Sequence, residues 1–424
     1  MSQFGVHATF VPGSTERAAA PDAVLACVIG TAPVHLLADG VPVPVNTPVV
    51  VRSEADYRKA FGNAGDDAGD YTLSVAADVL FNRYGAGAAV FVNVFDPEVH
   101  VDGGGDPDVT EVAAADIIGA DDGAGTLTGI EVAEAVFTET GLVPTVFVAP
   151  GFSDDAGVAV SLRRKAARHT ESFYGFTVLD VDAANTAAAI ATKATAGTGG
   201  VALDDPFAVQ AWPDVVAQIP TAAGQVERVE PSSLHVVGAL YDAATRNGGI
   251  PASPSNKTMQ GLRPAVSITR ADVTALRRAG LVTLTRFGPG GYRLAGNHTS
   301  AYLDGAPTAE TVEDGLIGGD IAARLSANYI ANSAVLATLR LVDDPTRKAQ
   351  IDRVLDSLRL LGNRVTASGA TLGFAAQYRA EDNTPEDLAD GVVTIRLSIL
   401  PPPAMETVNI PISIDLGYFA ALSA

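Results

Sequence analysis

The sequence is poor in cysteine and in long apolar runs, and each shortage excludes a class of protein. Its single cysteine, Cys27, cannot form a disulfide within the chain and excludes a cysteine-rich zinc or iron–sulfur site. The longest strongly apolar runs, residues 88–95 and 143–152, fall well short of the roughly 18 to 20 residues that span a bilayer. Residues 23–30 predict a buried strand rather than a signal peptide, because Asp22 adjoins them and no basic segment precedes them.

Basic residues are also scarce. The 424 residues include 28 Lys and Arg against 49 Asp and Glu, a formal net charge of -21, and lysine occurs at only five positions. This charge repels nucleic acids and anionic lipids, so we expect neither as a partner. A hydrophobic content of 47% with only 18% charged residues indicates a folded chain, and its length favours two or three domains.

The usual local signatures of catalysis and metal binding are missing. The sequence has no P-loop, no Gly-x-Ser-x-Gly elbow and no His-Glu-x-x-His motif. Gly123, Gly125 and Gly129 resemble a dinucleotide fingerprint, but their spacing is one residue too long and two aspartates precede them, which favours a surface turn. No acidic pair has the spacing of a calcium loop. We therefore expect no catalytic residue, no metal site and no cofactor.

Two further groups predict structure rather than chemistry. His169 lies in a basic stretch with Arg163, Arg164, Lys165 and Arg168, which predicts a solvated helix face, with ion pairing to an acidic neighbouring surface as the alternative. Trp212, next to Pro213, predicts a packing residue in a core or between domains.

Short apolar segments alternate with amphipathic ones through the first 250 residues. The predicted strands cover residues 24–29, 47–51, 88–95, 145–149, 173–180 and 206–212. The predicted helices cover residues 54–60, 72–84, 130–137, 155–169, 183–194 and 231–246. This alternation predicts an α/β fold with layered domains around a mostly parallel central sheet that is covered on both faces.

The last third changes to an α+β pattern. Residues 281–287 and 292–295 predict a hairpin, and residues 393–399 predict a half-buried strand. Two helices come between them. The second, at residues 346–361, has one apolar stripe and a mixed-charge face.

Both chain ends predict extended strand arms. Phe4, Val6 and Phe10 share one side of the first arm, and the second has a matching row of Val408, Ile410, Ile412 and Ile414. Pro411 cannot donate to a strand ladder, which indicates an edge strand. Unpaired strands of this kind favour addition to another sheet. Residues 11–13 and 401–403 are rich in Pro and Gly and are candidate flexible joints.

These patterns divide the chain into five segments, with a linker-like boundary at residues 101–108. The predicted segments are an N-terminal arm at 1–22, an N-terminal α/β part at 23–100, a middle α/β domain at 101–270, a C-terminal domain at 271–400 and a C-terminal arm at 401–424.

One loop carries a family resemblance. The segment from Gly248 to Gly261, with its Ser255-Asn256-Lys257 core, resembles a conserved loop of contractile tail sheath proteins. Further matches follow in family order along most of the chain: Asn46-Thr-Pro48 with Phe61-Gly62, Ala149-Pro-Gly151-Phe-Ser153, Gly280-Leu-Val-Thr-Leu with Gly296-Asn297-His-Thr299, and Pro401-Pro-Pro-Ala-Met-Glu406. Ile250 and Ala295 replace aromatic residues that are frequent in the family, and His298 replaces a frequent arginine.

The resemblance implies a structural subunit in a virion tail or injection particle, assembled in the host cytoplasm. Such subunits polymerise helically around a tail tube, exchange terminal arms with neighbours, and contract from a metastable extended state. The implied partners are further copies of the chain, the tube protein, and baseplate and tail terminator proteins. In the family a charged helix touches the tube, and the candidate contacts here are Arg347, Lys348, Arg353 and Arg359. The alternatives are an α/β nucleotide-binding or hydrolytic enzyme and a phage capsid or baseplate protein.

Overall fold

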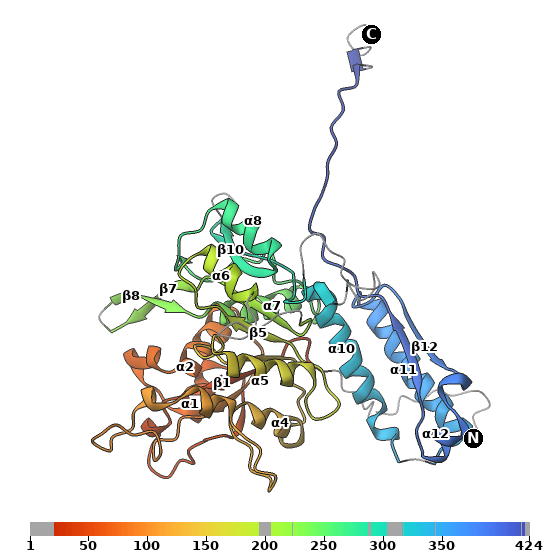
Figure 1. Cartoon of the computed structure of the whole chain (residues 1–424), viewed down its shortest axis with the longest axis horizontal. Coiled ribbons are helices and arrows are strands. Elements are labelled where there is room, and N and C mark those ends of the chain that lie inside the picture. The colour runs from red at the N-terminus through yellow and green to blue at the C-terminus, as the bar shows by residue number, and fades with distance from the viewer. Residues whose placement is uncertain are drawn as a thin grey trace, which may run out of the picture.

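The computed structural model describes residues 21–194, 205–222, 224–286, 290–302, 316, 318–343, 345–416 and 418–419. The chain forms a larger body around one wide sheet, a smaller body of helices and a two-stranded sheet, and a C-terminal arm that leads away from both (Figure 1). The N-terminal arm, with Phe4, Val6 and Phe10, lies outside the described residues.

The sheet of the larger body has eight strands in the order β11-β10-β6-β5-β4-β1-β3-β2. Pairing is parallel from β10 to β3 and antiparallel only at the edges, where β2 pairs with β3 and β11 with β10. This confirms the predicted mostly parallel sheet. The strands are β1 (Ala26–Gly30), β2 (Pro48–Val51), β3 (Ala89–Asn93), β4 (Val146–Val148), β5 (Thr177–Asp180), β6 (Ala208–Ala211), β10 (Leu281–Arg286) and β11 (Tyr292–Ala295).

Burial along the central strands shows that both faces of the sheet are covered. Every residue of β1 and β3 is buried. Because successive side chains of a strand point to opposite faces, a fully buried strand needs cover on both. The helical segments of the larger body are α1 (Glu54–Phe61), α2 (Thr72–Ala77), the π-helical η3 (Asp78–Arg83), α3 (Ala114–Ile118), α4 (Ala133–Thr140), α5 (Ala156–Ala167), α6 (Thr186–Ala194), α7 (Ser232–Arg246) and α8 (Arg270–Arg278).

Several predicted segments meet in this one sheet. The boundary at residues 101–108 lies between β3 and β4, yet both of these strands flank β1. The later segment contributes as well, because β10 and β11 extend the same sheet beyond β6. Strands from three of the predicted segments therefore share a core.

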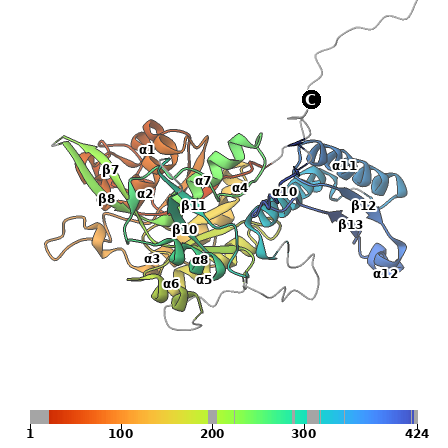
Figure 2. The ribbon, with the colours of Figure 1, turned by 90° about the horizontal axis from the view of Figure 1, so that it is seen from above.

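A second, three-stranded sheet was not predicted. It joins β7 (Val215–Thr221), β8 (Gly224–Glu230) and the short β9 (Arg263–Pro264). Most residues of β8 are exposed, and its two apolar side chains, Val226 and Val229, are three residues apart, so the strand lacks the apolar alternation by which half-buried strands are recognised. The hairpin projects from the larger body beside α2 in Figure 2.

The smaller body comprises α10 (Ile321–Thr338), α11 (Lys348–Ala367), β12 (Phe374–Tyr378), α12 (Pro385–Ala389) and β13 (Ile395–Ile399). Its core confirms the predicted apolar stripe, since Leu355, Leu358 and Leu361 of α11 are buried. The antiparallel pair β12–β13 packs its apolar side chains against α11. None of the helices in the described residues has the length and hydropathy of a membrane-spanning segment.

Buried amides on α10 join the two bodies. Asn328 Nδ2 donates to the carbonyl of Gly175 at 2.7 Å, and Asn332 Nδ2 donates to the carbonyl of Tyr174 at 2.8 Å. The backbone N–H of Tyr174 returns a bond to Asn332 Oδ1 at 2.9 Å. In both views α10 lies between the larger body and α11.

The solvated face predicted around His169 is wrong for His169 and Lys165, although Arg164 and Arg168 are exposed. His169 is 1% exposed and packs against the rings of Phe147 and Phe173, and burial lowers its pKa to about 4. Lys165 is also buried, with Nζ 2.5 Å from Glu131 and 2.6 Å from Glu134. The acidic surface that pairs with this stretch belongs to the same chain. Trp212 is buried as predicted, and its indole N–H donates to the carbonyl of Ala183.

Candidate assembly surfaces

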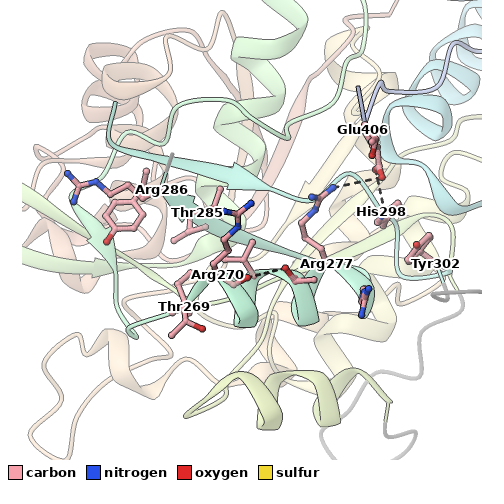
Figure 3. A pocket seen from close by; sticks show the side chains of 15 residues that line it. Thr269, Arg270, Arg277, Thr285, Arg286, His298, Tyr302 and Glu406 are labelled. Carbon is pink, nitrogen blue, oxygen red and sulfur yellow. Dashed lines mark hydrogen bonds and ion pairs between the residues drawn. The ribbon is translucent and has the colours of Figure 1, made fainter. Parts of the chain in front are cut away.

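The C-terminal arm is anchored at its root. The backbone of Ala404 lies beside the carboxylate of Asp320, the N-cap residue of α10, and favours the charged form of that carboxyl. The next carboxylate, Glu406, lies 3.8 Å from Arg277 and 3.4 Å from His298 (Figure 3). These contacts fix where the arm leaves the body.

Beyond Glu406 the arm is extended and exposed. Val408 is 66% exposed, Ile410 76%, and Ile412 and Ile414 are each 89% exposed. No described backbone bond joins residues 408–414 to another segment. Isolated isoleucine side chains at this exposure forgo most of the stabilisation that burial provides. The predicted alternation is therefore present as an unpaired apolar row.

The resemblance loop, residues 248–261, pairs with β11 through backbone hydrogen bonds at the outer edge of the sheet. The N–H of Asn256 donates to the carbonyl of Leu294 at 2.8 Å, and the N–H of Leu294 donates to the carbonyl of Lys257 at 3.1 Å. Ser255 Oγ accepts from the N–H of Gly296 at 3.2 Å. The loop thus covers the edge of the eight-stranded sheet, and edges left open invite unwanted pairing. Ser255, Asn256 and Lys257 have a structural use here.

Two backbone positions explain residue types in that loop. Asn256 has φ +59°, a left-handed conformation that asparagine tolerates better than most residues. At Gly261 an added Cβ would lie 2.4 Å from a Cγ of Val215 on β7, which is closer than van der Waals contact allows. Gly261 therefore permits close approach to the second sheet.

A buried charged network adjoins this loop, and sequence reasoning missed it. Glu230 is fully buried at the end of β8 and accepts from both terminal nitrogens of Arg83 at 2.8 and 2.9 Å. Arg228 lies 2.7 Å from the same carboxylate, and His235 Nε2 lies 3.0 Å from it. Burial would raise the pKa of Glu230, but the hydrogen bond from His235 and the charges of Arg83 and Arg228 outweigh it and hold the pKa below its usual value.

The network reaches the resemblance loop through Tyr84. The Tyr84 hydroxyl lies 3.1 Å from His235 Nδ1 and accepts from the N–H of Gln260 at 3.1 Å. Side chains of η3, β8 and α7 thus meet at one carboxylate, and Tyr84 connects this network to the resemblance loop. No sequence spacing connects Arg83 to Glu230, so only the fold brings them together.

A small acidic pocket lies at the carboxyl ends of β4, β5 and β6, where α/β enzymes place their sites. It measures about 190 Å³ and is lined by Asp154, Asp180, Asp182 and Asp214. The Asp180 carboxylate accepts hydrogen bonds from Ser153 Oγ and from both the N–H and the Oγ of Ser233, a residue in the first turn of α7. The Asp180 oxygens therefore have a structural role, because they hold Ser153 and the first turn of α7 against the end of β5. Within the described ranges no three His, Cys, Asp or Glu side chains could share a metal ion.

Asp180 predicts a pH-dependent stability. Burial, reinforced by the charge of Asp214, raises its pKa to about 7 from the ordinary 3.8. Between these values the folded state holds a proton that the unfolded state has released, so stability falls as pH rises, by at most about 1.4 kcal/mol per pH unit from this group. For Asp180→Asn we expect the free energy of unfolding, measured by urea denaturation, to fall less steeply between pH 4.5 and pH 7.5 than it does for the wild type. The exposed Asp121→Asn should keep the wild-type slope, and equal slopes in both variants would refute the assignment.

The predicted tube-contact residues all lie on or next to α11. Arg347 precedes its first turn, and Lys348, Arg353 and Arg359 are exposed along it. Arg359 pairs with Asp356 at 3.1 Å, a surface contact of small energetic value. These side chains are available to a partner.

Comparison with known proteins finds similarities that extend over nearly the whole chain. No protein-family model matches it. The tail sheath protein of Burkholderia phage BcepMu is 25% identical to it, over 93% of this chain and 93% of that protein. The helical sheath of the anti-feeding prophage (AFP) in its contracted state matches with a TM-score of 0.63 at 16% identity, over 97% of this chain and all of that one.

A chain of the AFP baseplate structure matches with a TM-score of 0.64 at 16% identity, over 98% of this chain and 100% of that chain. At such identities the solved structures show a shared fold. The phage relative extends the likeness to sequence along nearly the full length. The chain is therefore similar along nearly its full length to a tail sheath protein of a phage, and it shares the fold of the sheath subunits of contractile injection systems.

Proposed function

We propose that this subunit polymerises helically around a tail tube, linked to its neighbours by exchanged arms, and contracts to drive the tube into a target envelope. The observation that carries the proposal is the exposed apolar row of the C-terminal arm. A contact of one surface with a different surface of the next copy does not close on itself and generates a helix. Helical sheath assembly and baseplate association are seen in the matched AFP structures.

The proposed acceptor of an arm is the two-stranded sheet of the smaller body. Strands β12 and β13 pair only with each other among the described residues, and a pair of strands alone is marginally stable in water. Their apolar side chains alternate, as those of the arm do, and face α11. An added strand in the same alternation would bury its apolar row against the helices.

Cavities flank both outer edges of this sheet. One of about 630 Å³ lies between β12 and α11 and is lined by Gly362 and Phe374. Another of about 700 Å³ adjoins β13 and is lined by Val393 and residues of α10 and α11. Two edges suit two arms, which we propose are the C-terminal row at 408–414 and the N-terminal row of Phe4, Val6 and Phe10. The arm of the same subunit leads away from its own β12–β13 pair in Figure 1, which favours exchange between copies.

The same proposal gives each body a role. The larger body, with its single wide sheet, is the rigid outer part, and the smaller body with α11 faces the tube. This proposed arrangement departs from the predicted domain boundaries at residues 101 and 271. The baseplate and the tail terminator are the proposed partners at the two ends of the cylinder.

Electron microscopy of the concentrated full-length chain tests the proposal. We expect hollow, striated cylinders whose subunits repeat on a helical lattice. A chain that stays monomeric at high concentration, or forms closed rings, would contradict a sheath function.

The tube contact makes a separate prediction. Lys348→Glu with Arg353→Glu reverses two exposed charges on α11 and is expected to weaken co-assembly with the purified tube protein about tenfold, since complementary charges set partner choice and association rate. Self-assembly should be unchanged. Arg379→Glu, an exposed charge just after β12, is the matched control. Equal co-sedimentation of all three proteins would place the tube contact elsewhere.

A further inference from the structure

A basic groove lies between α8 and the β10–β11 hairpin of the larger body. It measures about 620 Å³, and four of its lining residues are arginines: Arg270, Arg277, Arg278 and Arg286. Among the described residues, Glu406 is the only carboxylate in the lining. In a chain with a net charge of -21, such a concentration of positive charge needs an explanation.

The fold places these arginines along one line. Arg270 and Arg277 are seven residues apart on α8, which is about two turns, so they share a face roughly 10 Å apart. Arg286 ends β10, and its guanidinium lies 6.0 Å from the centre of the Tyr292 ring (Figure 3). Guanidinium groups bind carboxylates more specifically than ammonium groups do, because their donors form a planar fork.

The groove is already partly occupied by a carboxylate. Glu406 lies in its Arg277 end, between Arg277 and His298. At the other end, no described carboxylate lies within ion-pair distance of Arg270 or Arg286. The exposed guanidinium groups of Arg270 and Arg286 can therefore form ion pairs with carboxylates of a partner. This half of the groove thus fits an acidic segment of another chain.

This chain offers acidic segments at its opposite end. The loops around residues 101–107 and 121–127 are each closed by a bridge, between Val101 and Pro107 and between Asp121 and Leu127. Their exposed aspartates include Asp102, Asp106, Asp121 and Asp122. In Figure 1 the orange loops that follow β3 lie at the bottom of the larger body, whereas α8 lies at its top.

Hydrogen bonds within each loop hold its backbone, and each loop carries exposed carboxylates. Asp102 Oδ1 accepts from the N–H groups of Gly104 and Asp106 at 2.7 and 3.0 Å, and Asp122 Oδ1 accepts from those of Ala124 and Thr126 at 2.7 and 2.9 Å. Backbone hydrogen bonds lower the pKa of both carboxyls, which keeps them ionised. A preformed loop loses little conformational entropy when it binds.

We propose that the Arg270–Arg286 half of the groove binds an acidic loop, at residues 101–107 or 121–127, of a neighbouring copy of this chain. Opposite poles of one subunit then make a head-to-tail contact, the type that repeats without closing. This contact deepens the proposed function and depends on it. The arm root shares the groove through Glu406, so the body contact and the exit of the arm meet at one place.

Reciprocal charge reversal in the full-length chain tests this contact. Arg270→Glu with Arg286→Glu is expected to raise the concentration needed for cylinder assembly at least tenfold, as measured by sedimentation. Adding Asp106→Arg, or adding Asp121→Arg, should restore assembly at least in part for the loop that binds, while Asp102 and Asp122 keep the hydrogen bonds that order each loop. Arg246→Glu with Arg263→Glu changes two exposed arginines outside the groove and should shift assembly less than twofold.

The outcomes separate this contact from the sheath function itself. If the wild-type chain forms no cylinders, the proposed function fails. If it forms them and the groove variant assembles normally, or assembles poorly and neither loop reversal restores it, the contact proposed here is overturned. Circular dichroism and thermal unfolding of each variant must match the wild type, and a loop reversal that rescues assembly demonstrates folding in any case.

Discussion

Replacing Ile410 and Ile412 with aspartate is expected to abolish cylinder formation and leave the subunit folded. Each of these side chains is at least three-quarters exposed in the free arm, so neither stabilises its own subunit. Burial against a neighbour would gain roughly 1.5–3 kcal/mol for each. Loss of both corresponds to more than about 100-fold in association, at roughly 1.4 kcal/mol per factor of ten. Sedimentation and electron microscopy measure assembly, and thermal unfolding measures folding.

The opposite side of the same arm supplies the matched control. Asn409→Asp with Ser413→Asp adds the same two charges to the same segment, but on the side that an added strand would turn to solvent. These changes should leave assembly within a few-fold of the wild type. If both pairs of changes block assembly equally, charge rather than strand alternation is responsible. If neither does, the arm is not the connecting element.

The fold could be predicted from the sequence where the information is local. Strands β1 and β3 are short apolar runs, and α11 has an apolar stripe with 3.6-residue spacing, so each segment shows its own burial. Strand β13 was predicted from its alternation, but its partner β12 could not be predicted in the same way. Residues 374–378 alternate only weakly, with alanine at two positions, and gain their strand from pairing with β13.

The errors share a physical cause, which is tertiary contact between polar groups. His169 lies in a basic stretch that looks solvated, yet the chain folds Phe147 and Phe173 over it. The hairpin β7–β8 has an exposed outer strand, β8, that is held by backbone pairing with β7. Of the candidate surfaces, the arms could be recognised from alternation alone, whereas the groove beside α8 needs residues that the fold brings together from positions 270, 286 and 406.

The buried carboxylate of Glu230 provides the strongest test of how the larger body is held together. Glu230→Ala leaves Arg83, Arg228 and His235 without their shared acceptor in an interior site, and breaking a buried charged network from one side costs about 3–5 kcal/mol. Such a loss is a large part of the stability of a typical domain. We expect urea denaturation of the variant to begin at a much lower concentration.

Glu227, three residues earlier on β8, is the matched control. It pairs with Arg263 at 2.7 Å, but both side chains are about half exposed, so Glu227→Ala should cost no more than about 1 kcal/mol. Glu230→Gln separates charge from hydrogen bonding, because the amide oxygen can still accept while the negative charge is gone. If Glu230→Ala costs no more than Glu227→Ala, the network does not stabilise the fold. If Glu230→Gln is as stable as the wild type, the stabilisation comes from the hydrogen bonds that Glu230 accepts. The negative charge of Glu230 is then not what holds Arg83 and Arg228 at this site.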